Sequence, residues 1–283
     1  MKKYALYNSA ACSGRGKSLA AKVENILTED EIVFQDVREI TDYDEYFAKI
    51  EKDAALIICG GDGTLNRFVN ATLGKLGDRE VYYFACGSGN DFMREVKGEE
   101  EIVKINDYIR DLPIVTVKGQ QYAFVNGVGY GIDGYCCEVG DKIHEEKPDK
   151  KINYAGIAIK GLLFHYKPTT ATITVDGETH TFKNVWIAPT MHGKYYGGGM
   201  IPCPEQDRNN PEKTVSVMVF HGKCKLKTLM IFPSIFKGGH VKKTKNVSVF
   251  KGKEVHVSFD SPRPLQVDGE TILDVTEYSV KSN

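Results

Sequence analysis

The stretch Gly60-Gly61-Asp62-Gly63-Thr64 decides how this sequence is interpreted. It follows the apolar run 54–59 and precedes residues 65–73, whose pattern predicts a helix. Three glycines in four residues give a backbone that can approach a bulky anion without hindrance from Cβ atoms. A strand that feeds such a turn into a helix directs N–H groups and the positive end of the helix dipole at one point, which suits a phosphate. The stretch alone also fits a glycine turn with Thr64 as the helix cap.

The aspartate in this loop points to a reaction. A carboxylate does not bind a phosphate directly, but Asp62 can hold a divalent cation that bridges phosphates, or it can orient a hydroxyl. The stretch therefore indicates phosphoryl transfer.

A second glycine loop, 86–91, follows another predicted strand at 81–85. Predicted strands at 3–8, 32–37 and 54–59 alternate with predicted helices, among them 17–27 and 43–52. Such alternation predicts an open parallel sheet, which binds ligands at the carboxyl ends of its strands. Both glycine loops fall at such ends.

The second half of the chain has a different pattern. Strand patterns dominate from 112 to 279, including a hairpin of 169–175 and 179–188 around Asp176-Gly177. One predicted helix, 152–165, interrupts them. We predict an α/β protein, with an N-terminal open parallel sheet and helices over 1–112 and a C-terminal β-sandwich over 113–283. The cleft between the two domains is the expected active site.

The composition is that of a soluble globular protein, with 41% hydrophobic and 27% charged residues in 283. No apolar run approaches the roughly 20 residues of a membrane span, so we expect a cytoplasmic protein. The seven cysteines show no Cys-x-x-Cys pair, which argues against a zinc site or a disulfide framework.

The charge distribution suggests a membrane as partner. Nine lysines and no acidic residue occur in 221–253, although the whole chain has a net charge of −1. These lysines flank an apolar run within 226–236, a combination that peripheral proteins use on anionic lipid. We expect a peripheral membrane contact and no nucleic acid. The alternative is a helix that packs on the core and has a solvated fringe of lysines.

The two glycine loops resemble the superfamily of diacylglycerol kinases, sphingosine and ceramide kinases, bacterial lipid kinases and NAD kinases. Gly87-Ser88-Gly89-Asn90-Asp91 is similar to the Gly-Thr-x-Asn-Asp motif of the lipid kinases, whereas NAD kinases have an aromatic-ended glycine motif there. The resemblance implies the predicted two-domain layout, and it allows the final strand to return to the first domain. It also implies ATP and Mg²⁺ as cofactors. The implied nucleotide-binding residues are Asn8, Gly60, Gly61, Asp62, Gly63, Thr64, Asn66, Ser88, Gly89, Asn90 and Asp91.

Four aspartates are the metal ligands that the resemblance implies: Asp62, Asp91, Asp133 and Asp207. Two departures bear on them. Arg67 replaces the usual glutamate after Asn66, and the loop 207–211 replaces the Asp-Gly-x-Leu element through which bacterial members bind a structural magnesium. The second departure argues against a bound structural metal.

Gln266-Val267-Asp268-Gly269-Glu270 matches the family's Asp-Gly-Glu near the C-terminus, although Asp-Gly alone is most often a hairpin turn. The resemblance assigns the general base for a lipid hydroxyl to Asp268 or Glu270. We prefer Glu270, and the sequence leaves the choice open.

The sequence thus predicts an ATP-dependent lipid kinase in which Asp62 and either Asp268 or Glu270 are catalytic. The acceptor would be diacylglycerol or a related lipid at an anionic membrane surface. The alternatives are a NAD kinase and, because of Arg67 and the altered loop at Asp207, a non-catalytic lipid- or nucleotide-binding regulatory protein. An exposed edge of the sandwich would permit a homodimer.

Overall fold

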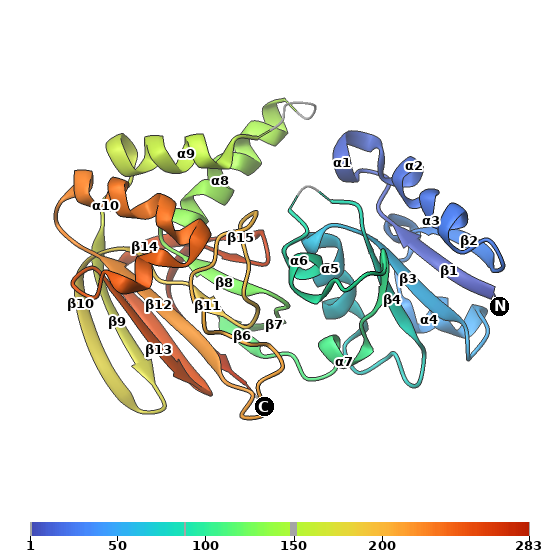
Figure 1. Cartoon of the computed structure of the whole chain (residues 1–283). Helices are drawn as coiled ribbons and strands as arrows, with labels where there is room; N and C mark the ends of the chain where they lie inside the picture. The colour runs from blue at the N-terminus through green and yellow to red at the C-terminus, as the bar shows by residue number, and fades with distance from the viewer. Residues whose placement is uncertain (1, 88, 148–151, 283) are drawn as a thin grey trace. The chain divides into compact units, whose positions relative to one another are not determined.

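The computed structural model describes residues 2–87, 89–147 and 152–282. The chain divides into two compact units, Met1–Asp111 and Leu112–Asn283 (Figure 1). No helix in the described ranges is both long enough and apolar enough to cross a bilayer.

The described part of the first unit contains a five-stranded sheet in the order β2-β1-β3-β4-β5. The first four of these strands are parallel, and β5 pairs antiparallel with β4. The strands are β1 (Lys2–Tyr7), β2 (Glu31–Asp36), β3 (Ala55–Gly60), β4 (Val81–Ala85) and β5 (Ile102–Lys104). β3 is buried along its whole length, as its continuous apolar run predicts for the centre of a parallel sheet.

Helices connect these strands. They are α1 (Ala11–Gly14), α2 (Gly16–Ala20), α3 (Lys22–Ile26), η1 (Val37–Glu39), α4 (Tyr43–Lys49), α5 (Asp62–Thr72), α6 (Asp91–Val96) and α7 (Asn106–Ile109). The predicted helix 17–27 is divided into α2 and α3 at Ala21, which keeps helical dihedral angles. In α5, Leu65, Phe68 and Val69 are buried at the spacing of one helix face, so this face packs into the core.

The second unit contains a ten-stranded sheet in its described part. Its strands are β6 (Ile114–Val117), β7 (Gln120–Ala123), β8 (Gly127–Tyr130), β9 (Thr169–Val175), β10 (Glu178–Ile187), β11 (Thr190–Met191), β12 (Val215–His221), β13 (Val247–Gly252), β14 (Glu254–Val267) and β15 (Glu270–Lys281). The long strand β14 pairs with β9 through residues 255–259 and with β8 through residues 265–267. The predicted sandwich is therefore closed through β14.

The final strand is where the structure first differs from the prediction. β15 lies between β14 and β6, in the sheet of the second unit. The expectation that the last strand returns to the first domain is therefore wrong. The apolar side chains of β15 pack inside the second unit, where Val275, Tyr278 and Val280 are buried in the hydrophobic core.

The helices of the second unit are α8 (Ile132–Glu146), α9 (Tyr154–Lys160), the π-helical turn η2 (Gly161–His165), α10 (Lys225–Ile231), η3 (Phe232–Lys237) and η4 (Gly239–Lys242). α9 and η2 fall on the predicted helix 152–165. The sequence analysis missed α8, because glycines 134 and 140 weaken its helical pattern. The structure explains Gly134, since a Cβ built on it would lie 2.0 Å from the carbonyl oxygen of Pro264 in β14.

Candidate functional site

The first glycine loop joins the carboxyl end of β3 to the start of α5. Gly61 precedes α5, and its carbonyl oxygen accepts a hydrogen bond from Leu65 N at 3.1 Å. A Cβ built on Gly60 would lie 2.4 Å from Cβ of Thr64, so only glycine allows Thr64 to fold back over the end of the strand. The loop therefore presents backbone at the N-terminus of an 11-residue helix, where the dipole favours an anion.

The second glycine loop meets the first backbone to backbone. A Cβ built on Gly87 would lie 2.3 Å from Cα of Gly61, so Gly87 has no room for a side chain, and a Cβ built on Gly61 would make a tight contact of 3.1 Å with Cα of Gly87. Asn90, in the left-handed conformation (φ 53°), closes this loop on itself. Its Oδ1 accepts from Gly87 N at 3.0 Å, and its Nδ2 donates to Gly87 O at 2.9 Å. Ser88, a predicted nucleotide contact, lies outside the described residues.

Asp62 ties the two loops together. Its Oδ2 accepts from Asp91 N and its Oδ1 accepts from Phe92 N, both at 2.9 Å, so it caps α6 from the first turn of α5. A Cβ built on Gly89 would lie 3.3 Å from Asp62 Oδ2 and 3.9 Å from Asp91 Oδ2. The carboxylates of Asp62 and Asp91 thus both lie near Gly89.

Asn8 lies just after β1, which pairs with β3, so it falls at the same edge of the sheet as the first glycine loop. Its Oδ1 accepts from Ala10 N at 3.0 Å. The carbonyl oxygen of Asn8 would lie 1.8 Å from a Cβ built on Gly16, which explains the glycine at the start of α2. The side chain of Asn66 is buried in α5, and its Oδ1 accepts from Asn70 Nδ2 at 3.2 Å.

In the second unit, the Asp-Gly-Glu motif forms the turn between β14 and β15. The carboxylate of Asp268 accepts from three consecutive backbone N–H groups, those of Val125, Asn126 (2.8 Å) and Gly127 (2.9 Å). Asp268 is 9% exposed, so its anion is an internal clamp for this segment. Glu270 is half-buried at the start of β15. The backbone therefore holds the Asp268 carboxylate in place, and the choice of base between Asp268 and Glu270 stays a prediction.

Asp133 lies in the first turn of α8, close to that motif. Its Oδ2 accepts from the hydroxyl of Tyr196 at 3.3 Å, and both Asp133 and the Gln266 amide lie against Cα of Gly129. Gln266 Oε1 in turn accepts from Gly269 N at 2.6 Å. Burial raises the pKa of Asp133 to about 6. Its Oδ1 is buried without a hydrogen-bond partner among the described residues. The group is therefore poised to be neutral in mildly acidic conditions.

In the loop 207–211, the residue with long-range contacts is Arg208 and not the predicted ligand Asp207. Asp207 is exposed, and its Oδ1 accepts from Asn209 N at 2.9 Å. Its neighbour Arg208 is buried and donates to Val125 O at 3.1 Å and to Asn126 Oδ1 at 3.2 Å. Arg208 and Asp268 thus hold the same backbone segment. The sequence analysis missed Arg208, because nothing in a polar loop distinguishes a buried arginine from an exposed one.

The predicted metal ligands do not form a ready-made metal centre. Across the described ranges, no three His, Cys, Asp or Glu side chains are grouped so that they could hold a metal ion. Asp62 and Asp91 lie together in the first unit, and the exposed Asp207 is bound within its own loop. Of the four predicted ligands, Asp62 and Asp91 are the pair that lies together in the described ranges, and the metal-binding role of all four stays a prediction.

Comparisons with known proteins agree with the motifs. The family model described as "Diacylglycerol kinase catalytic domain" matches residues 2–118, and "YegS C-terminal NAD kinase beta sandwich-like domain" matches residues 126–279. "Putative lipid kinase YtlR" of Bacillus subtilis (strain 168) is 27% identical over 266 residues, covering 87% of this chain and 81% of that protein. "Diacylglycerol kinase" of Mycobacterium tuberculosis (strain ATCC 25618 / H37Rv) is 25% identical over 214 residues, covering 72% and 66%.

The fold also has a solved counterpart. The crystal structure described as "a putative diacylglycerol kinase from Bacillus anthracis str. Sterne" matches with a TM-score of 0.70 at 20% identity, over 99% of this chain and 91% of that chain. This match shows a shared fold, and the family models matched by both halves of the sequence give the assignment. The chain belongs to the family of kinases that join a diacylglycerol kinase catalytic domain to a YegS-type C-terminal β-sandwich domain.

Proposed function

We propose that this protein is an ATP-dependent lipid kinase that phosphorylates a hydroxyl of diacylglycerol or of a related lipid. The observation that carries the proposal is the contact of two glycine loops at Gly61 and Gly87, fastened by Asp62. Family membership supports phosphoryl transfer, and the names of the relatives support a lipid acceptor.

The nucleotide phosphates would bind against the two loops. The N-terminus of α5 supplies backbone N–H groups and a positive dipole end, and the absence of Cβ atoms at Gly60, Gly61 and Gly87 lets the phosphates come close. Asn8 follows the neighbouring strand β1 and would contribute at the same edge. Much of the catalysis in such transfers is positioning, which this rigid junction of two loops suits.

Asp62 and Asp91 fit a magnesium ion that arrives with the nucleotide. Mg²⁺ is usually held by one or two carboxylates together with substrate phosphates and waters, so it does not need a preformed protein cage. A carboxylate oxygen that accepts a backbone N–H can still ligate a metal, since it has two acceptor sites. The ion would supply neutralisation of the charge on the transferred phosphoryl group.

Glu270 is the proposed general base. It would accept the proton of the lipid hydroxyl as that oxygen attacks the γ-phosphate, which requires hydrogen-bond reach and a suitable pKa. Asp268 would have a positioning role, because its carboxylate accepts hydrogen bonds from the backbone N–H groups of residues 125–127 and so fixes its turn. The turn that Asp268 fixes is the one that carries Glu270.

A surface of the second unit suits contact with a membrane. The apolar run 226–236 divides between two faces: Ile231, Phe232 and Ile235 are buried, whereas Leu226 and Met230 are 64% and 68% exposed. A second group of exposed apolar side chains lies on α9 and η2 and consists of Tyr154, Ile159 and Phe164. One face of the run thus packs on the core, and we propose that the exposed face enters the headgroup region of a bilayer.

The test is transfer of labelled γ-phosphate from Mg-ATP into a panel of lipids in anionic mixed micelles, with NAD as a soluble acceptor. We expect label in one lipid and none in NAD. Asp62→Ala should lower kcat by about 10²-fold or more, through lost positioning and charge stabilisation. Asp53→Ala removes an exposed carboxylate of the same unit and serves as the matched control. Labelled NAD would identify a NAD kinase, and bound ATP without transfer to any acceptor would identify a non-catalytic binding protein.

A further inference from the structure

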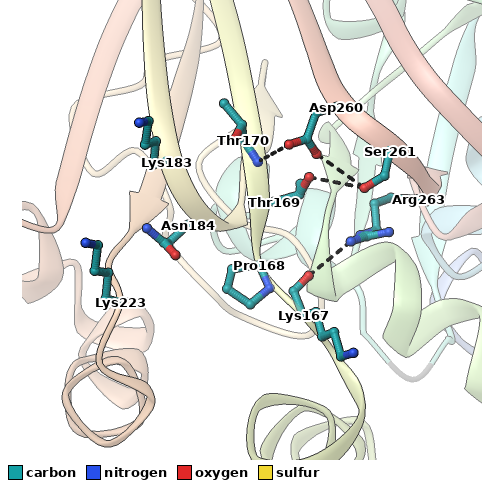
Figure 2. Close-up of a pocket in the computed structure, with 10 residues that line it drawn as sticks. All are labelled: Lys167, Pro168, Thr169, Thr170, Lys183, Asn184, Lys223, Asp260, Ser261 and Arg263. Carbon is teal, nitrogen blue, oxygen red and sulfur yellow. Dashed lines mark hydrogen bonds between the residues drawn. The ribbon is translucent and has the colours of Figure 1, made fainter.

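A cationic cavity of about 530 Å³ lies in the second unit, at one end of its sheet (Figure 2). Figure 2 shows Lys183, Asn184 and Lys223 on one side of it and Asp260, Ser261 and Arg263 on the other. The full lining is Lys167, Pro168, Thr169, Thr170, Lys183, Asn184, Lys223, Asp260, Ser261 and Arg263. None of these residues belongs to the glycine loops or to the Asp-Gly-Glu turn, so the cavity shares no residue with the proposed catalytic groups.

The lining suits a phosphate group. It contains four cationic side chains and one carboxylate, and that carboxylate is engaged within the wall. Asp260 Oδ2 accepts from Thr170 N at 3.2 Å, and its Oδ1 accepts from the hydroxyl of Ser261 at 3.3 Å. The guanidinium of Arg263 donates to Pro262 O at 2.9 Å and to Lys167 O at 3.1 Å, and its buried Nε has no hydrogen-bond partner among the described residues. Arginine and lysine donors around a hydroxyl-bearing wall are the usual means of holding a phosphate.

The position of the cavity points to the source of that phosphate. Lys167 follows the last residue of η2 by two positions, and Lys223 precedes the first residue of α10 by two. The two helical segments touch, since Lys225 Nζ donates to Leu163 O at 3.3 Å. Phe164 on η2 is 75% exposed and Leu226 on α10 is 64% exposed. The cavity therefore lies where the two segments with exposed apolar side chains join the sheet.

We propose that this cavity binds the phosphate of an anionic phospholipid headgroup, a lipid distinct from the acceptor. Apolar side chains of η2 and α10 would insert about 5–10 Å into the boundary between headgroups and acyl chains, while the cavity holds one phosphate at headgroup level. The proposal rests on the proposed membrane contact and is independent of phosphoryl transfer. A charge-complementary cavity beside an apolar surface provides the two signals that stable peripheral binding requires.

The first experiment measures sedimentation of the full chain with phosphatidylcholine vesicles, with and without phosphatidylglycerol, at fixed salt and without ATP. Lys167→Gln/Lys223→Gln removes two exposed charges from the cavity. We expect about thirtyfold weaker binding to the anionic vesicles, because each basic side chain at such a surface contributes about 1 kcal/mol.

The matched control is Lys251→Gln/Lys253→Gln, which removes the same amount of charge and, like the change at Lys223, alters the lysine-rich segment 221–253. Lys251 pairs with Ser216 near the start of β12, whereas Lys223 follows the other end of that strand, so the control lies far from the cavity. We expect this variant to bind like the wild type. If the two double variants lost equal affinity for the anionic vesicles, only a diffuse electrostatic attraction between the protein and the vesicle surface would be shown, and the proposal would be overturned.

The second experiment distinguishes a lipid headgroup from a free phosphate. Trp186 is the single tryptophan of the chain, and its indole N–H donates to Gly222 O at 2.9 Å, next to Lys223. Its fluorescence should change saturably with short-chain phosphatidylglycerol below the micelle concentration, and Lys167→Gln/Lys223→Gln should abolish the change. Inorganic phosphate that binds as tightly as the short-chain lipid would refute a headgroup site. Kinase activity in uncharged micelles should persist in this variant, so failure of the headgroup site and failure of the proposed reaction give different results.

Discussion

Replacing Gly87 by alanine should disable the nucleotide site through the contact between the two glycine loops. The added Cβ would lie 2.3 Å from Cα of Gly61 and 2.9 Å from its nitrogen. Carbon atoms in ordinary contact are about 3.5–4.0 Å apart, so the two backbones must separate by about 1 Å or more. Because both close neighbours are backbone atoms, no side-chain rotation can relieve the clash.

A displacement of this size falls on the atoms that would hold the nucleotide phosphates. A misplacement of about 1 Å commonly lowers turnover by about 10²-fold, and crowding a packed site costs about 1–3 kcal/mol of folding free energy. We therefore expect Gly87→Ala to lower kcat for lipid phosphorylation by about 10²-fold, to weaken ATP binding, and to leave the chain folded.

The assay compares ATP affinity by calorimetry, labelled-phosphate transfer and thermal unfolding for three proteins: wild type, Gly87→Ala and Gly98→Ala. Gly98 is the matched control, because a Cβ there meets no atom within 4 Å and its φ does not require glycine. We expect the control to retain full activity. If Gly87→Ala bound ATP and transferred phosphate as the wild type does, the two loops would not form the nucleotide site and the reasoning would be refuted.

Three further predictions concern the second unit. Asp268→Ala should lower the free energy of unfolding by about 3 kcal/mol or more in urea titrations, because the buried N–H groups of 125–127 lose their acceptors; a change below about 1 kcal/mol would contradict the clamp. Glu270→Gln should lower kcat by about 10²-fold or more with an unchanged Tm, and normal turnover would exclude it as the base. Burial and the charge of Arg208 lower the pKa of His192 from 6.5 to about 3. As the pH falls, the unfolded chain binds this proton before the folded chain does, so the free energy of unfolding should decrease from pH 6.5 towards pH 3. His192→Gln should make the urea midpoint decrease less over this pH range. Equal pH dependence of the urea midpoint in wild type and His192→Gln would contradict this prediction.

The features that the sequence predicts well have local signals. Each glycine loop directly follows an apolar strand, and the Asp-Gly turn at 176–177 lies between two alternating segments, so neighbouring residues determine both structures. The contact of Gly61 with Gly87 follows from the pairing of β3 with β4 in a parallel sheet. A ligand site at this edge is therefore within reach of sequence reasoning.

The features that the sequence does not predict depend on partners far away along the chain. Asp62 caps α6 through bonds to residues 29 and 30 positions away. The Asp268 carboxylate is held by backbone N–H groups more than 140 positions away. α8 was missed because Gly134 lowers its helix propensity, although the glycine is required for close packing against β14. Such long-range pairings are set by the tertiary fold, and a single sequence carries no mark of them.

The most direct test of the central claim is the stoichiometry of the reaction. Wild-type protein is incubated with Mg-ATP and mixed micelles that contain diacylglycerol or another lipid alcohol, and ADP and phosphorylated lipid are quantified together by mass spectrometry. The account predicts one phosphorylated lipid for each ADP formed, with the new phosphate on the acceptor hydroxyl. Formation of ADP without phosphorylated lipid, or binding of ATP without formation of ADP, would contradict it.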